Sequence, residues 1–290
     1  MGMLAAVFSD ASALGSIYNK SQQELSDSLL KLASGKRINT AGDDLGGYTR
    51  AMNLKTSYDS YDNINQNITD FKGVLSTAQT ASDSINSDLQ RMNELINLSQ
   101  QSTDNSQKDG YQAEFIQKAS EIQSIRNNTT IGSYVPLNNT SNPLATIAVS
   151  PGESGTSIPI NLSPAVTNAQ LTSLNDASVI QIGSDQSAYA TPALAYTAAR
   201  NTVAAAQTTL NTYTSSVSGY ADELTSFSNI NETASTNQKS AEQSIMEINQ
   251  ADELAKYTAA DIRSQSAIAM LAQSNMSARN VLILYGLKGQ

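Results

Sequence analysis

The residues that decide the fold are 199–283, which read ARNTVAAAQTTLNTYTSSVSGYADELTSFSNINETASTNQKSAEQSIMEINQADELAKYTAADIRSQSAIAMLAQSNMSARNVLI. Every seventh residue of this stretch is apolar or aromatic, and the row keeps one phase throughout. A sustained repeat of this kind holds one side of a helix against a partner helix. No proline follows Pro192 and the stretch contains one glycine, Gly219, so we expect a single helix on the order of 130 Å long. The row consists of Ala199, Ala206, Tyr213, Tyr220, Phe227, Ala234, Ala241, Ile248, Ala255, Ile262, Ala269, Met276 and Ile283.

A second row, four residues after each member of the first, changes character halfway along the stretch. It is apolar up to Leu224 and mostly polar from Asn231 onward. The part from Ala199 to Phe227 is therefore expected to pack stably within one subunit, against a helix at 45–101. The later part buries too little apolar area to offset the entropy of ordering it. We expect it to fold fully only beside residues 4–32 and neighbouring subunits.

The N-terminal segment carries a matching row from Leu4 to Leu32, interrupted by Ser21 and Ser28. Gly35 is a natural helix C-cap, and the turn-forming residues between Gly35 and Gly47 predict a loop. Helices are expected at about 45–101 and 111–126, separated by a polar loop at 102–110. The two ends of the chain should then lie side by side.

Residues 129–192 have a different composition and contain all six prolines of the chain. Short strands are expected at 146–149 and 157–162 around a turn at 151–155, with a third candidate at 178–182. The predicted fold class is therefore mainly α, a long antiparallel helical bundle or coiled coil with a small β-hairpin region.

The composition excludes several functional classes. The chain has no Cys and no His, which removes thiolate catalysis, the common zinc sites and the Ser-His-Asp triad. The net charge of −9 argues against nucleic-acid binding, and no stretch has the ~20 apolar residues of a membrane span. Met1 to Phe8 lacks the basic start of a secretory signal. We expect no enzyme activity, cofactor or metal; Asp43 and Asp44 are interpreted as loop or capping residues.

Three motifs resemble bacterial flagellins. Near the N-terminus stand Asn19-Lys20-Ser21-Gln22, then Leu-Leu-Lys-Leu-Ala-Ser-Gly-Lys-Arg-Ile-Asn at 29–39, then Ala41 and Asp43-Asp44. Near the C-terminus, Leu-Ala-Gln-Ser-Asn at 271–275 precedes Arg-Asn-Val-Leu at 279–282. The segment at 89–95 reads Leu-Gln-Arg-Met-Asn-Glu-Leu. The resemblance covers roughly residues 14–128 and 191–286, with both terminal motifs in order.

The resemblance implies a structural subunit that self-assembles into the flagellar filament, the helical propeller for swimming. Residues 1–44 would be the N-terminal part of an inner-tube helical domain with a connecting loop, and 241–290 its C-terminal part. Residues 45–190, with the β-hairpin region at about 129–190, and the returning helix 191–240 would form the next shell. The variable outer domains look missing, which implies a thin filament or one decorated or sheathed by other flagellins or proteins.

The resemblance also implies partners and an extracellular location. The subunit would be exported unfolded, without a cleavable signal peptide, by the flagellar export apparatus and a chaperone. It would meet hook-associated junction and cap proteins, but no nucleic acid, and it would not insert into a membrane. The connecting loop would include Arg37, Asn39, Asp43 and Asp44.

Two further sets of residues follow from the resemblance. A self-assembly set, here called the terminal seam, comprises Leu4, Val7, Leu14, Leu25, Leu32, Ile248, Ile262, Ala269, Met276 and Ile283. A second set is a subunit contact or, as in some flagellins, a face recognised by a vertebrate innate immune receptor. It comprises Gln90, Arg91, Glu94, Leu95 and Glu114. Asn93 stands at a commonly basic position, which favours the subunit contact.

Two alternatives stay open at this point. A flagellin-like protein of the hook–filament junction shares the terminal helices, and Thr130 to Tyr134 departs from the family's Phe-Asn-Gly entry to the hairpin. From a different class, a secreted adhesin or enzyme on a helical stalk would need more chemistry than this chain offers. The filament subunit is the preferred interpretation.

Overall fold

The computed structural model describes residues 2–138, 144–150, 155–162, 164–176 and 180–286. These form two units, one built from Met1–Ser57 and Asn237–Gln290 and the other from Tyr58–Thr236. Within the described residues no helix is long and apolar enough to cross a membrane. The mainly α architecture with one small antiparallel sheet confirms the predicted fold class.

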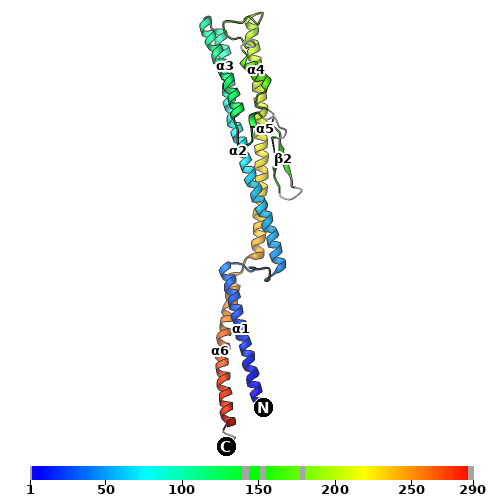
Figure 1. Ribbon diagram of the computed structural model, residues 1–290, viewed down its shortest axis with the longest axis vertical. Helices are drawn as coiled ribbons and strands as arrows, with labels where there is room; N and C mark the ends of the chain where they lie inside the picture. The colour runs from blue at the N-terminus through cyan, green and yellow to red at the C-terminus, as the bar shows by residue number, and fades with distance from the viewer. Residues whose placement is uncertain (1, 139–143, 151–154, 163, 177–179, 287–290) are drawn as a thin grey trace. The chain divides into compact units, whose positions relative to one another are not determined.

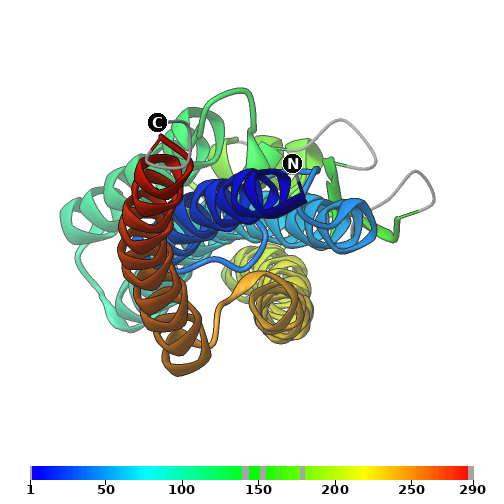
Figure 2. The same cartoon turned by 90° about the horizontal axis from the view of Figure 1, so that it is seen from below.

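The first unit is dominated by two terminal helices, α1 (Gly2–Ser34) and α6 (Gln250–Gly286), which pack against each other in opposite directions. They are the blue and red helices of Figures 1 and 2. The same unit contains the start of α2 (Leu45–Gln101) and the end of α5 (Pro192–Met246). A small cluster of Ile38, Ala51 and Met246 holds these pieces together.

The predicted single helix over 199–283 is wrong, because α5 ends at Met246 and α6 begins at Gln250. The residues between them bond to the loop after α1 instead of continuing the helix. The Arg37 N–H donates to the Met246 carbonyl at 2.6 Å, and the Ile248 N–H donates to the Gly35 carbonyl at 3.2 Å. Gly35 has a φ of 67°, a conformation that favours glycine. The seven-residue row of apolar residues continues across this break in the sequence. Its members before and after the break, however, do not lie on one continuous helix.

The second unit packs most of α2 and α5 with α3 (Asn105–Asn128) and α4 (Asn168–Asn175). Both predicted rows of α5 lie in one core with the apolar stripe of α2 as far as Leu224, and their members there are all buried except Tyr220, which is half-buried. The expected packing of residues 199–227 against the helix at 45–101 is therefore confirmed, while its stability stays a prediction. Buried side chains of this core include Ile68, Leu75, Ile85, Leu89, Val203, Leu210, Tyr213 and Val217.

Helix α3 begins earlier than expected, so residues 105–110 are helical and not a loop. Asp104 caps the helix, because its carboxylate accepts a hydrogen bond from the Ser106 N–H at 2.8 Å. This satisfies one of the free N–H groups of the first turn. The low helix propensity of the segment is overridden by the cap. Helix α4 was not expected from the sequence at all.

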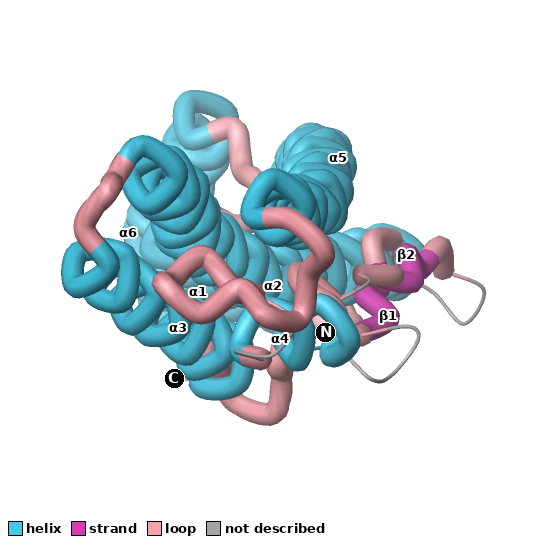
Figure 3. The backbone as a smooth tube through the Cα atoms, turned by 90° about the horizontal axis from the view of Figure 1, so that it is seen from above, coloured by secondary structure: helices cyan, strands magenta, loops and turns pink. Residues whose placement is uncertain are grey.

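The predicted hairpin is present as β1 (Ala145–Ala148) and β2 (Ser157–Ile160), paired antiparallel with Ala145 opposite Ile160. Figure 3 shows it beside the helices of this unit. Ile147, Ile158 and Ile160 face the core. The expected turn falls largely on 151–154, outside the described residues. Residues 180–182, the described part of the third candidate strand, do not form a strand. Instead, the Gln112 side chain donates a hydrogen bond to the Ile180 carbonyl and accepts one from the Ile182 N–H.

Candidate functional site

Among the described side chains, the fully buried ones at the contact between α1 and α6 are small or polar. Ser28 donates a hydrogen bond from Oγ to Glu253 Oε1 at 2.8 Å, and both residues are buried. Arg263 reaches across to Glu24 with an Nη2–Oε2 distance of 2.6 Å. The remaining buried residues of this contact are Ser21, Ala260, Ser264 and Ala267. Such a contact fixes the register of the two helices but buries little apolar area.

The large apolar side chains of α6 lie exposed instead. Ile262 lies nine residues after Glu253, or about 2.5 turns of helix, which places it on the side opposite α1. Its exposed fraction is 59%, and Met276 and Ile283 are exposed at 57% and 55%. We call the exposed set the outer apolar face; it comprises Leu254, Ile262, Ile268, Met270, Met276 and Ile283. Exposed apolar groups gathered on one helix mark an interaction surface.

The structure divides the terminal seam into two groups. Leu14, Leu25 and Leu32 are half-buried on α1, in register with the buried serines. Ala269 is exposed with the three large α6 members of the seam, and Ile248 is half-buried in the segment between α5 and α6. The side chains of Leu4 and Val7 fall outside those described. A simple pairing of the two terminal helices would require the α6 members of the seam to face α1. In the structure they do not.

The connecting loop uses both predicted carboxylates to hold its own backbone. Asp43 Oδ2 accepts hydrogen bonds from the N–H groups of Thr40 at 2.8 Å and Asn39 at 2.9 Å. These two bonds lower the pKa of Asp43 below its ordinary value. Asp44 Oδ1 accepts from the Gly47 N–H at 2.9 Å in the first turn of α2. Arg37 approaches Asp44 to 3.8 Å, so the loop residues act together as a structural junction.

Gly47 is required by this junction for steric reasons. A Cβ on Gly47 would lie 2.5 Å from Asp44 Oδ2 and 2.7 Å from Ile38 Cδ1. Real Cβ atoms do not approach other atoms so closely. Asp44 and Gly47 are therefore linked by packing.

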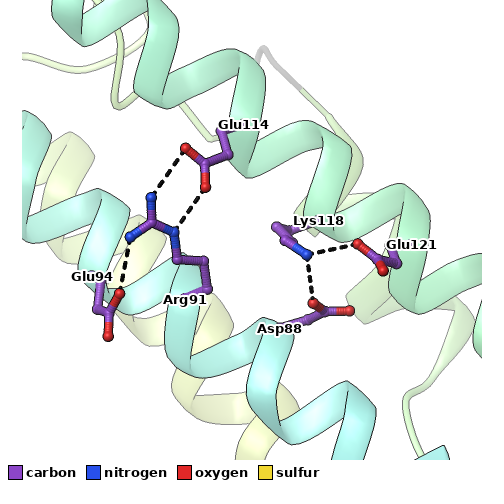
Figure 4. Close-up of polar contacts among 6 residues, drawn as sticks. All are labelled: Asp88, Arg91, Glu94, Glu114, Lys118 and Glu121. Carbon is purple, nitrogen blue, oxygen red and sulfur yellow. Dashed lines mark hydrogen bonds and ion pairs between the residues drawn. The ribbon is translucent and has the colours of Figure 1, made fainter.

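The predicted face on α2 and α3 is an ion-pair cluster, shown in Figure 4. Arg91 donates to both Glu114 oxygens, at 2.8 and 3.2 Å, and to Glu94 at 3.1 Å. The bond from Arg91 lowers the pKa of Glu114. Gln90 and Glu94 are exposed, whereas Leu95 is fully buried in the core. The structure thus joins Arg91, Glu94 and Glu114, but Leu95 does not lie on this surface.

A second ion pair beside this cluster was not anticipated from the sequence. Lys118 donates from Nζ to Asp88 Oδ1 at 3.0 Å and to Glu121 Oε2 at 2.7 Å. The i,i+3 spacing of Lys118 and Glu121 on one helix could have indicated part of it. The Asp88 side chain is only 10% exposed, so this pair joins α2 to α3 at the edge of the core.

Comparison with known proteins gives consistent results. A family model described as the bacterial flagellin N-terminal helical region matches residues 9–140. A flagellin of Halalkalibacterium halodurans is 29% identical over 88% of this chain and 89% of its own length. A flagellin of Salmonella typhimurium strain LT2 is 35% identical over 112 residues, which are 38% of this chain and 23% of that relative.

Among solved structures, the chain is similar to a Vibrio parahaemolyticus protein assigned to the flagellar hook-associated class. The TM-score is 0.61 and the identity 14%, over 71% of this chain and the whole of that one. At this identity the likeness concerns the fold alone. It supports the helical architecture described above.

Proposed function

We propose that the chain is a bacterial flagellin, a structural subunit of the flagellar filament, and that its first unit is the part that polymerises. The observation that carries the proposal is the outer apolar face of α6. It presents six large apolar side chains to solvent, while the contact with α1 is polar. A second subunit is the natural cover for such a surface.

The energetics favour burial of this face between subunits. Fully burying one large aliphatic side chain stabilises by about 1.5–3 kcal/mol. Burying several such side chains along one helix therefore contributes more stabilising free energy than most single contacts do. The polar contact between α1 and α6, by comparison, sets the register in which the two helices present themselves. We infer that the terminal seam acts in two ways. Its α1 members pack within the pair of helices α1 and α6, and its α6 members contact a neighbouring subunit.

The remaining predictions of domain roles, contacts and partners are part of this proposal. Residues 1–44 and 241–290 would form the inner tube, and 45–240 the surrounding shell. Gln90, Arg91, Glu94 and Glu114 would contribute to a contact between shells. The export apparatus, a chaperone and the junction and cap proteins would be the partners during assembly. The filament would be extracellular. It would be thin or sheathed, because few residues lie between α3 and α5, where the family's variable outer domains would fall.

The experiment is polymerisation of the purified subunit, seeded with filament fragments and followed by sedimentation and electron microscopy. Unsubstituted subunits should form long, uniform filaments. Ile262→Asp should abolish them, because the carboxylate would have to be buried between subunits. The monomer's helical circular dichroism should be unchanged, since Ile262 is exposed. Ile262→Leu is the matched control and should polymerise normally. Short caps in place of filaments would favour the junction alternative.

A further inference from the structure

The two strands of the hairpin have very different outer edges. The Val149 N–H donates to the Thr156 carbonyl at 2.8 Å. Because hydrogen-bonded and non-bonded pairs alternate along an antiparallel ladder, Ile147 pairs through hydrogen bonds with Ile158. The N–H groups of Thr146 and Ala148 therefore point away from β2, toward the open edge of β1.

The outer edge of β2 is already protected. Pro159 has no N–H to offer at its outward position. The next outward N–H, that of Asn161, donates to the Tyr220 hydroxyl of α5 at 3.1 Å. Both features are ordinary ways of blocking an edge strand. The β2 edge is therefore blocked at Pro159 and Asn161, and we call it the closed edge; its other outward N–H, that of Ser157, lies at the very start of the strand.

The outer edge of β1 is open. Among the described residues, the outward N–H groups of Thr146 and Ala148 have no hydrogen-bond partner. No charged residue or proline occurs between Leu144 and Val149. Unprotected edge strands of this kind readily pair with another extended chain.

A groove runs along this open edge, with a volume of about 550 Å³. One wall is β1 and the other is the α2 segment that carries Phe71 and Val74. Tyr134 adds an aromatic side, and its ring lies edge-on to Phe71 with 5.4 Å between ring centroids. Asp70 also lines the groove, and its side chain is exposed to water. The groove thus offers main-chain hydrogen bonds on one side and apolar surface on the other, the two features used in strand addition.

We propose that the β1 edge and its groove accept an extended segment of a neighbouring copy of this chain, which adds to the hairpin as a third strand. This rests on the proposed function, because polymerisation brings the copies together. In a helical polymer each contact joins two different surfaces, as a groove and an extended segment do. The strand edge is uncharged, and only 15% of the chain's residues are charged. A segment of this chain can therefore enter at little cost in desolvated charge.

Hydrogen exchange on filaments assembled from the pure, unsubstituted protein tests this directly. The amides of Thr146 and Ala148 should exchange rapidly in the monomer and at least about tenfold more slowly in the filament. No other protein is present, so protection has to come from a second copy. Unchanged rapid exchange at both amides in well-formed filaments would overturn the proposal and leave the filament function standing. Failure of the unsubstituted protein to polymerise would instead count against the proposed function.

A pair of proline variants gives an independent readout. Ala148→Pro removes an outward N–H from the open edge, and Ser157→Pro removes one from the closed edge. Both keep the ladder bonds, because proline is tolerated where the N–H points out of the sheet. Circular dichroism should show both monomers folded. Ala148→Pro should raise the critical concentration for polymerisation about tenfold, and Ser157→Pro should leave it unchanged. Equal critical concentrations for the two variants would contradict strand addition.

Discussion

Ser28 and Glu253 join the two ends of the chain through a 2.8 Å hydrogen bond between buried side chains. A serine and a glutamate occupy positions where a coiled coil would place leucines. Lys256 completes the arrangement with a 2.9 Å ion pair to the same carboxylate. The pairing of α1 with α6 therefore depends on the charge of Glu253, which makes it sensitive to pH.

Acid should weaken the contact between α1 and α6. Burial of the Glu253 carboxyl acts to raise its pKa, but the hydrogen bonds from Lys256 and Ser28 outweigh it and the pKa is lowered below 4.5. A group whose pKa is depressed on folding stabilises the folded state above its unfolded pKa. This contribution is lost as the pH falls through the folded value. The protection of the α6 amides, taken at each pH from 6 to 3 as the ratio of the intrinsic to the observed exchange rate, should fall below about pH 4.5.

The variant Glu253→Gln is the control for this prediction. The amide keeps the shape and accepts the Ser28 hydrogen bond, but it does not titrate. The difference in α6 protection between the unsubstituted chain and the Glu253→Gln variant should disappear at the acid end of the range. An identical pH profile in both proteins would show that other carboxylates cause the effect.

Much of the second unit could be predicted from the sequence, because its apolar pattern is continuous. Val203, Leu210 and Val217 recur on one face of α5 and are all buried. The hairpin was recognisable from its composition. The break between Met246 and Gln250 was not, because no proline or glycine marks it. It arises from hydrogen bonds to Gly35 and Arg37, residues more than two hundred positions away in sequence.

The candidate surface was predictable in part of its residues but not in its direction. The spacing of Ile262, Met276 and Ile283 predicted them as interface residues, but it could not say which side of α6 would meet α1, and it did not single out Leu254, Ile268 or Met270. Ser28 looked like a weak point in a hydrophobic row. In the structure it is part of the contact, since its hydroxyl satisfies the buried Glu253.

Gly35→Ala should destabilise the first unit by about 1–2 kcal/mol, because the φ of 67° at this position forces a side chain into the left-handed region. Gly219→Ala is the matched control. Gly219 lies within α5 with no atom near enough to clash with a Cβ, so alanine should stabilise the chain by roughly 0.5–1 kcal/mol. Urea unfolding of both variants measures the difference, and shifts of the same sign would contradict the assigned backbone conformation.

The two ion pairs between α2 and α3 should differ in their contribution to stability. Arg91 and Glu114 are each more than a third exposed, and such pairs contribute about 0–1 kcal/mol. Lys118→Ala should cost more, about 1–3 kcal/mol, because it leaves the largely buried Asp88 carboxylate without its cation. Urea unfolding of Lys118→Ala and Arg91→Ala tests the order. A larger loss for Arg91→Ala would contradict it.

The first unit should gain most of its stability on assembly. In the monomer, residues 12–34 and 250–283 are held by the polar contact between α1 and α6, while the outer apolar face remains in water. Their amides should therefore exchange much faster than those of the α2 and α5 residues in the core of the second unit. Polymerisation should slow exchange in both terminal helices by several orders of magnitude, because opening them would then expose the buried apolar side chains. Amide exchange followed by mass spectrometry on monomer and filament measures this, with Val203 and Leu210 of α5 as the internal reference. Full protection of both terminal helices in the monomer would show that the polar contact is sufficient and that folding of the ends precedes assembly.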